Sequence, residues 1–81
     1  MTCRILVVNS NTSDSVTARI ALAATAARPE GCTVETVSAP FGLPLIVTRA
    51  DWSVAGPATV AALAARRGQF DAAVVACFGD P

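Results

Sequence analysis

The sequence contains no lysine and no histidine, and its six arginines balance six carboxylates, so the formal net charge over 81 residues is zero. The arginines are scattered and form no basic cluster, which argues against nucleic-acid binding. No apolar run approaches the roughly 20 residues of a membrane span, and the chain does not open on a basic segment followed by an apolar one. We therefore expect a cytoplasmic domain that binds neither nucleic acid nor membrane.

The three cysteines have a spacing that fits no metal or disulfide pattern. Cys3, Cys32 and Cys77 are odd in number and widely separated, and no C-x-x-C pair occurs. This spacing argues against both a disulfide framework and a structural zinc site. We expect free thiols in a reducing compartment and no metal.

Hydrophobic residues make up 53% of the chain and charged residues 15%, a composition typical of a folded domain. A domain of this size buries only about 60% of its unfolded surface, which leaves little margin of stability. We expect a single α/β domain over residues 1–81 that is the incomplete N-terminal lobe of a longer protein.

The first half of the chain shows two strand patterns around one helix pattern. Residues 4–9 form a continuous apolar run ended by polar residues, which predicts a strand buried on both faces. Thr12 or Ser13 can cap the helix predicted over residues 14–27. Residues 33–37 alternate as in a shorter strand near the edge of a sheet.

The second half begins with a long segment without periodicity. Residues 39–50 include two prolines and one glycine, and loops of this length are usually functional, so we expect a wall of a substrate site here. Pro57 suits the first turn of a second helix that ends near Arg66 and Gly68. Residues 72–76 are small and apolar, which predicts a third buried strand.

The order βαβαβ predicts a three-stranded parallel sheet. Right-handed crossovers allow an arrangement in which the third strand lies beside the first, with the second outside. The loops after Asn9 and Ala76 then share the carboxyl edge of the sheet, where open α/β sheets place their ligands. Asn9, Asn11 and Cys77 are predicted to converge there, the two asparagines as substrate-binding candidates.

The loop of residues 9–13 contains no glycine, so it lacks the close backbone approach that a dinucleotide cofactor needs. It offers instead short amide and hydroxyl groups just before a helix N-terminus, which suit a small polar ligand. The alternative is that these side chains only cap the helix and the turn.

Cys77 is the candidate for chemistry. Asp80 can cap a following helix whose first residue is Pro81, which places the thiol at a helix entrance. The helix dipole and free amides there favour the thiolate, so Cys77 can act as base or nucleophile. The alternative is a buried thiol that only packs. Cys3 and Cys32 lie away from the predicted crevice, and we expect them to be structural.

Residues 4–13, the proline-containing middle segment and residues 71–81 together resemble the hydantoin racemases of the aspartate/glutamate racemase superfamily. The resemblance implies the flavodoxin-like half of a two-lobed racemase fold. Phe78 and Gly79 follow the thiol, where related amino-acid racemases have Asn-Thr, and this favours the hydantoin or allantoin branch. Ser10 departs from the pattern, because the family usually has proline there and the loop loses that ring's restriction on the backbone.

The resemblance also implies a mechanism without metal or cofactor. Two cysteines flank a chiral carbon, and Cys77 matches the first of them by motif. The second would come from a homologous half outside these 81 residues, so the chain alone is expected to be inactive, and the full-length enzyme is expected to be a homo-oligomer. Asn11 and the backbone amides of Phe78 and Gly79 would hold the polar ring atoms of a neutral cyclic amide.

Two alternatives stay open from the sequence. The first is another enzyme of the same superfamily that relies on cysteine, an arylmalonate decarboxylase or a maleate isomerase. The second is a non-catalytic flavodoxin-like binding module in which Cys77 is merely buried.

Overall fold

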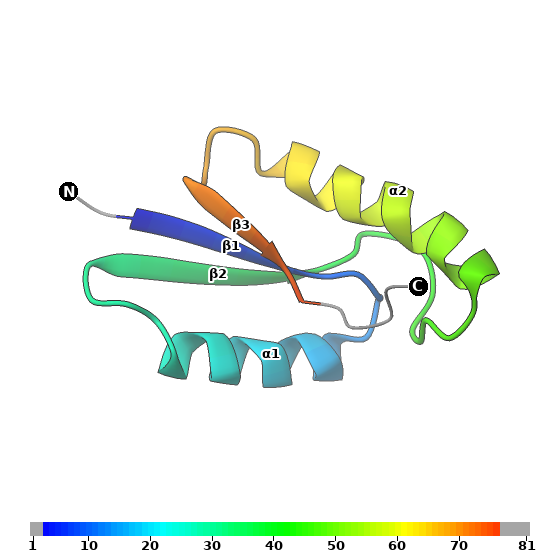
Figure 1. The fold of residues 1–81 in the computed structure, drawn as a ribbon, viewed down its shortest axis with the longest axis horizontal. Coiled ribbons are helices and arrows are strands. Elements are labelled where there is room, and N and C mark those ends of the chain that lie inside the picture. Colours follow the sequence, from blue (N-terminus) through cyan, green and yellow to red (C-terminus); the bar gives the residue numbers. More distant parts are fainter. Residues whose placement is uncertain (1–2, 77–81) are drawn as a thin grey trace.

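The structure, a computed structural model, describes residues 3–76. Its elements are, in chain order, β1 (Cys3–Asn9), α1 (Asp14–Ala26), β2 (Cys32–Ser38), α2 (Arg49–Ala65) and β3 (Ala72–Val75). The strands form a parallel sheet in the order β2-β1-β3, and α1 and α2 lie on opposite sides of it (Figure 1). The predicted βαβαβ order and the placement of the third strand beside the first are confirmed.

β1 is the central strand and carries the core. Leu6 and Val8 are no more than 1% exposed and pack with Ala62 of α2, whereas Val7 points to the other face and is 5% exposed. Successive side chains of a strand point to opposite faces, so both faces of β1 are covered. The prediction of a strand buried on both faces is confirmed for this element.

α1 begins where the sequence places its cap. Ser13 is the N-cap, and its hydroxyl accepts a hydrogen bond from the Val16 amide at 3.4 Å. Asp14 lies in the first turn, where a negative charge interacts favourably with the helix dipole. The helix ends at Ala26, one residue before the predicted end.

β2 lies at one edge of the sheet, as predicted, but it is not a short strand. It has seven residues, the same number as β1. The two strands pair over their whole length, from Cys3 beside Cys32 to Asn9 beside Ser38. The continuous pairing with β1 explains why the polar residues of β2 do not shorten it.

α2 starts eight residues earlier than predicted, at Arg49 instead of Pro57. Its start is a capping box, in which the Thr48 hydroxyl accepts from the Asp51 amide and the Asp51 carboxylate accepts from the Thr48 amide at 3.0 Å. The Val47 amide donates to the same carboxylate at 2.9 Å. These two backbone donors hold the pKa of Asp51 below its ordinary value.

Pro57 is therefore an interior residue of α2. A proline lacks the amide that would bond to the carbonyl of Ser53, and its ring usually crowds the side chain of the preceding residue. Here the preceding residue is Gly56, which has no side chain to crowd, and Ser53 is exposed, so water can reach its carbonyl. The glycine and the exposed turn let the helix continue through the proline.

The face of α2 that packs on the sheet is built from small residues. Ala55, Ala58, Thr59 and Ala62 are buried, whereas Val60 is 64% exposed. Small side chains let the helix axis approach β1 closely. Over residues 3–76, neither helix combines the length and the hydropathy needed to cross a membrane.

β3 corrects the prediction of a third buried strand. All four of its residues, from Ala72 to Val75, are exposed. It bonds to β1 on one side only, in register from Ile5 beside Ala72 to Val8 beside Val75. An apolar run of this kind is buried when other elements cover it, and in this chain the strand stands at the open edge of the sheet.

Asp71 and Arg4 are joined at the amino edge of the sheet. The Asp71 carboxylate accepts from the backbone amide of Arg4 at 2.8 Å and from its guanidinium at 3.3 Å. The guanidinium and the backbone amide lower the pKa of Asp71. Asp71 is thus an exposed residue just before β3 whose carboxylate is paired with Arg4.

We expect Asp71→Asn to reduce stability slightly at neutral pH, and we expect the deficit to vanish in acid. A carboxyl whose folded-state pKa is depressed contributes stability above its unfolded pKa of about 3.9, and this contribution is lost as pH falls through the folded-state pKa. The effect is small because both side chains are half exposed and salt screens the pair. Urea denaturation of parent and variant at pH 7 and near pH 2 measures the difference. A deficit that is equal at both pH values would contradict the assignment.

Candidate functional site

The carboxyl edge of the sheet brings together the ends of all three strands (Figure 1). Asn9 at the end of β1 lies beside Ser38 at the end of β2. On the other side, the amide of Ala76, just after β3, donates to the carbonyl of Val8 at 2.9 Å. The ends of β1 and β3 are therefore neighbours, as predicted, whereas the loop that follows Ala76 lies outside the described residues.

Asn9 is the centre of a hydrogen-bond network in the loop after β1. It is 2% exposed. Its amide nitrogen contacts Asn11 Oδ1 at 2.7 Å, Thr17 Oγ1 at 3.0 Å and the carbonyl of Ser13 at 3.3 Å. Its Oδ1 accepts from the backbone amide of Asn11 at 3.2 Å. The hydrogen-bonding capacity of Asn9 is thus used inside the protein.

Asn11 differs from Asn9 because the nitrogen of its side-chain amide remains available to a ligand. Its Oδ1 accepts from Asn9 Nδ2 and from the Ser13 amide at 2.9 Å. Its Nδ2 makes no hydrogen bond with any residue between 3 and 76, and the residue is only half-buried. The network therefore fixes Asn11 through its oxygen and leaves two amide protons at the carboxyl edge of the sheet.

Two hydroxyls that the sequence analysis did not select extend the network from α1 to β2. The Thr17 hydroxyl lies 3.1 Å from the carbonyl oxygen of Ser13 and is hydrogen-bonded to the Ser38 hydroxyl. The Ser38 hydroxyl donates to Asp14 Oδ1 at 2.9 Å. The signal for Ser38 is its place at the end of a strand, and the signal for Thr17 is its position one helical turn after the Ser13 cap.

The irregular segment between β2 and α2 lies against the same loop. The Thr12 amide donates to the carbonyl of Leu43 at 2.9 Å, and the Ala39 amide lies 2.8 Å from the carbonyl of Asn9. Phe41 and Leu45 of this segment are 49% and 67% exposed. The segment thus places apolar side chains close to the polar loop, and its role as a substrate wall stays a prediction.

Three predicted site residues, Cys77, Phe78 and Gly79, lie outside the described residues. The other two cysteines lie at the opposite, amino edge, where Cys3 pairs in register with Cys32. A hydrogen bond with the Cys32 thiol, followed by desolvation, raises the pKa of Cys3. A raised pKa disfavours the reactive thiolate form, in line with the structural role expected for Cys3.

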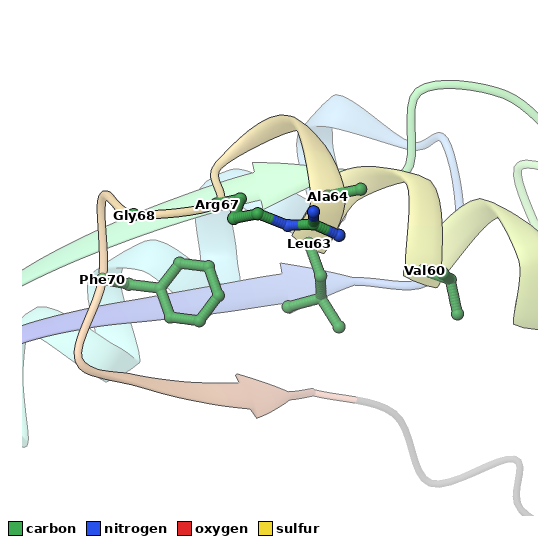
Figure 2. A pocket seen from close by; sticks show the side chains of 6 residues that line it. All are labelled: Val60, Leu63, Ala64, Arg67, Gly68 and Phe70. Atoms are coloured by element: carbon green, nitrogen blue, oxygen red, sulfur yellow. The ribbon is translucent and has the colours of Figure 1, made fainter.

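Two apolar hollows of about 400 Å³ each lie beside the sheet, one along the end of α2 and one under α1, and neither contains the polar loop. Figure 2 shows one of them, in which Leu63 of α2 lies beside the ring of Phe70 and Val60 stands further along the helix. The other lies between α1 and the sheet and is lined mainly by aliphatic side chains, among them Ile5, Val7, Ile20 and Val74. These hollows offer packing surface and, apart from Arg67 and Arg28, no titratable group.

A metal site is not evident in the part of the chain that the structure describes. Within residues 3–76, no three side chains of histidine, cysteine, aspartate or glutamate gather where they could hold a metal ion. The groups available for a ligand at the carboxyl edge are amides and hydroxyls, which recognise small polar molecules by hydrogen bonding.

The fold is an open parallel α/β sheet with polar groups at its carboxyl edge, where such sheets usually place their ligands. The profile of the Asp/Glu/hydantoin racemase family matches residues 5–81, and the chain belongs to this family. The resemblance found in the sequence is thereby confirmed. A comparison with functionally curated proteins found no match.

Two solved structures show how the chain relates to that family. Allantoin racemase from Klebsiella pneumoniae is similar with a TM-score of 0.93 and 36% sequence identity, over 99% of this chain and 33% of that one. Allantoin racemase from Pseudomonas fluorescens is similar with a TM-score of 0.90 and 32% identity, over 96% of this chain and 33% of that one. The present chain therefore spans a third of the length of each.

Proposed function

We propose that residues 1–81 form the N-terminal lobe of a cofactor-independent racemase that acts on a cyclic amide of the hydantoin class, such as allantoin. The observation that carries the proposal is the fixed Asn11 amide at the carboxyl edge, beside the point where Ala76 leads directly into Cys77. The identity of 32–36% to two allantoin racemases supports the substrate class.

The proposed reaction needs only proton transfers. The Cys77 thiolate removes the proton from the chiral ring carbon, and the electron pair of the broken C–H bond moves toward the adjacent carbonyl oxygen. A thiol on the opposite face, from the second half of the enzyme, then donates its proton to the same carbon. Cys77 ends as a thiol and its counterpart as a thiolate, so the charges balance.

The chain's own groups have separate tasks in this scheme. The Asn11 amide donates to a polar atom of the ring, and Asn9 holds Asn11 through its oxygen. The backbone amides of Phe78 and Gly79 stabilise the negative charge that develops on the carbonyl oxygen, as preorganised donors do in other enzymes. Positioning of the ring between two thiols supplies much of the remaining rate.

The surfaces beside β3 support the view that this chain is one lobe of a larger assembly. β3 exposes Val74 and Val75 by 51% and 45%, and Val74 also lines an apolar hollow between α1 and the sheet. Such a surface needs a covering partner, which the second lobe or another subunit of a homo-oligomer can provide. We place the full-length enzyme in the cytoplasm.

The experiment is a racemisation assay with the full-length protein in deuterated buffer. We expect the optical rotation of allantoin or of a 5-substituted hydantoin to decay faster than in a sample without protein, with one solvent deuteron entering the chiral carbon per inversion. The rotation of aspartate and glutamate should not change. Release of carbon dioxide from an arylmalonate, or isomerisation of maleate, would identify one of the alternative enzymes. Binding of the ring compounds without turnover would favour the binding module.

A further inference from the structure

Ser10 and Thr59 form a buried hydroxyl pair between the site loop and α2. Ser10 is 1% exposed and Thr59 is 8% exposed. Thr59 Oγ1 donates to Ser10 Oγ at 2.9 Å and also lies 2.8 Å from the carbonyl oxygen of Ala55. Thr59 Oγ1 therefore lies within hydrogen-bond distance of both its own helix and the serine.

The pair matters for the site because Ser10 belongs to the loop after β1. Ser10 stands between Asn9, which organises the network, and Asn11, which offers its amide to a ligand. The side chains of both asparagines bond within the loop and to the start of α1. Within residues 3–76, the Ser10–Thr59 bond is the hydrogen bond that ties this loop to α2.

The surroundings make the contact costly to lose. Ala55, Ala58 and Ala62, on the same face of α2 as Thr59, are also buried, so the pair lies in the packed layer between α2 and the sheet. A buried hydroxyl that loses its partner keeps the full cost of its desolvation, whereas the removal of both partners is milder. The chain thus contains a long-range contact, 49 residues apart in sequence, that holds the backbone of the site loop.

We propose that Ser10 and Thr59 are positioning residues, which set the place of the Asn11 amide and thereby the affinity for the ring substrate. This inference rests on the proposed function for its effect on catalysis. Its effect on the loop itself can be measured without turnover.

The test compares four variants of the full-length protein: Thr59→Val, Thr59→Ser, the double variant Ser10→Ala with Thr59→Val, and Thr25→Val as a control. Thr25 is an exposed threonine of α1 away from the pair, so its variant reports the cost of the same change outside the site. Each variant is assayed for KM and kcat with allantoin, for thermal unfolding, and for hydrogen exchange of the Asn11 and Ser13 amides.

We expect Thr59→Val to raise KM about five- to tenfold with kcat within about twofold, because a displaced loop weakens ground-state and transition-state binding alike. The Asn11 and Ser13 amides should exchange about tenfold faster, since both bond to side chains of the loop network. Thr59→Ser keeps the hydroxyl and should restore both values. The double variant should regain part of the thermal stability while its KM stays raised.

A purely structural role predicts that the melting temperature falls while KM and amide exchange stay unchanged. If Thr59→Val and the double variant melt earlier but keep the KM and the amide exchange of Thr25→Val, the proposal is overturned. If the parent protein turns over no ring substrate, the proposed function fails. Amide exchange then decides whether the pair holds the loop, because faster exchange in Thr59→Val supports the positioning role and unchanged exchange overturns it.

Discussion

Replacement of Cys77 by serine in the full-length protein is expected to lower the racemisation rate by about 100- to 10,000-fold, the usual cost of removing a positioned acid or base. Serine keeps a similar shape, but its hydroxyl has a far higher pKa than a thiol, so it cannot remove the ring proton at neutral pH. The decay of optical rotation of a 5-substituted hydantoin measures the rate, and mass spectrometry measures the deuterium that enters at the chiral carbon.

Cys3→Ala and Cys32→Ala are the matched controls for this prediction. The two thiols pair at the amino edge of the sheet, at the other end of the strands from the site loop, and the pKa of Cys3 is raised. We expect both variants to keep the parental rate, and Cys32→Ala to lose some stability because Cys32 is buried. A Cys77→Ser protein that racemises at the parental rate would show that this thiol is not the base.

Asn9→Asp is expected to destabilise the protein by about 2–4 kcal/mol at pH 7. The substitution keeps the shape of the side chain and replaces its amide nitrogen with an acceptor. That atom now faces Asn11 Oδ1, the carbonyl of Ser13 and the hydroxyl of Thr17, the first two of which can only accept. Urea denaturation of the variant and the parent measures the difference.

The penalty of Asn9→Asp should depend on pH in a defined direction. Burial among acceptors raises the folded-state pKa of the new carboxyl above its unfolded value of about 3.9. The protonated carboxyl can donate a hydrogen bond, so the penalty is smallest below about pH 4 and grows as pH rises through the folded-state pKa. Gln69→Glu, at an exposed position, makes the same chemical change and should show neither the loss nor the pH dependence. A variant as stable as the parent at every pH would contradict the assigned network.

The buried hydroxyl pair of Ser10 and Thr59 is relevant to the serine at position 10, where the family pattern usually has proline. A proline at that position would restrict the backbone through its ring. Here the Ser10 hydroxyl is held by the Thr59 side chain from α2 instead. The hydrogen bond from α2 thus restrains the loop at the position where the family pattern has a proline ring.

Local chemistry accounts for what the sequence determined by itself. The apolar run of β1, the Ser13 cap and the acidic residue in the first turn of α1 act within a few residues, so they were predicted nearly to the residue. The local sequence also contained the signal for the start of α2, because Thr48 and Asp51 have the spacing of a capping box. Pro57 obscured it, since a proline suits the first turn of a helix as well as this tolerated interior position after glycine.

Contacts between distant residues decided the rest. The apolar sequence of β3 did not reveal its exposure, because burial depends on which elements cover a strand and not on its own side chains. Asn9 and Asn11 look equivalent in the sequence, but the bond of Asn9 to Thr17 gives them different surroundings, and no local pattern indicates the bond between Ser10 and Thr59. Only the fold brings residues 8 and 49 positions apart within hydrogen-bond distance, and such a bond depends on geometry that no local pattern encodes.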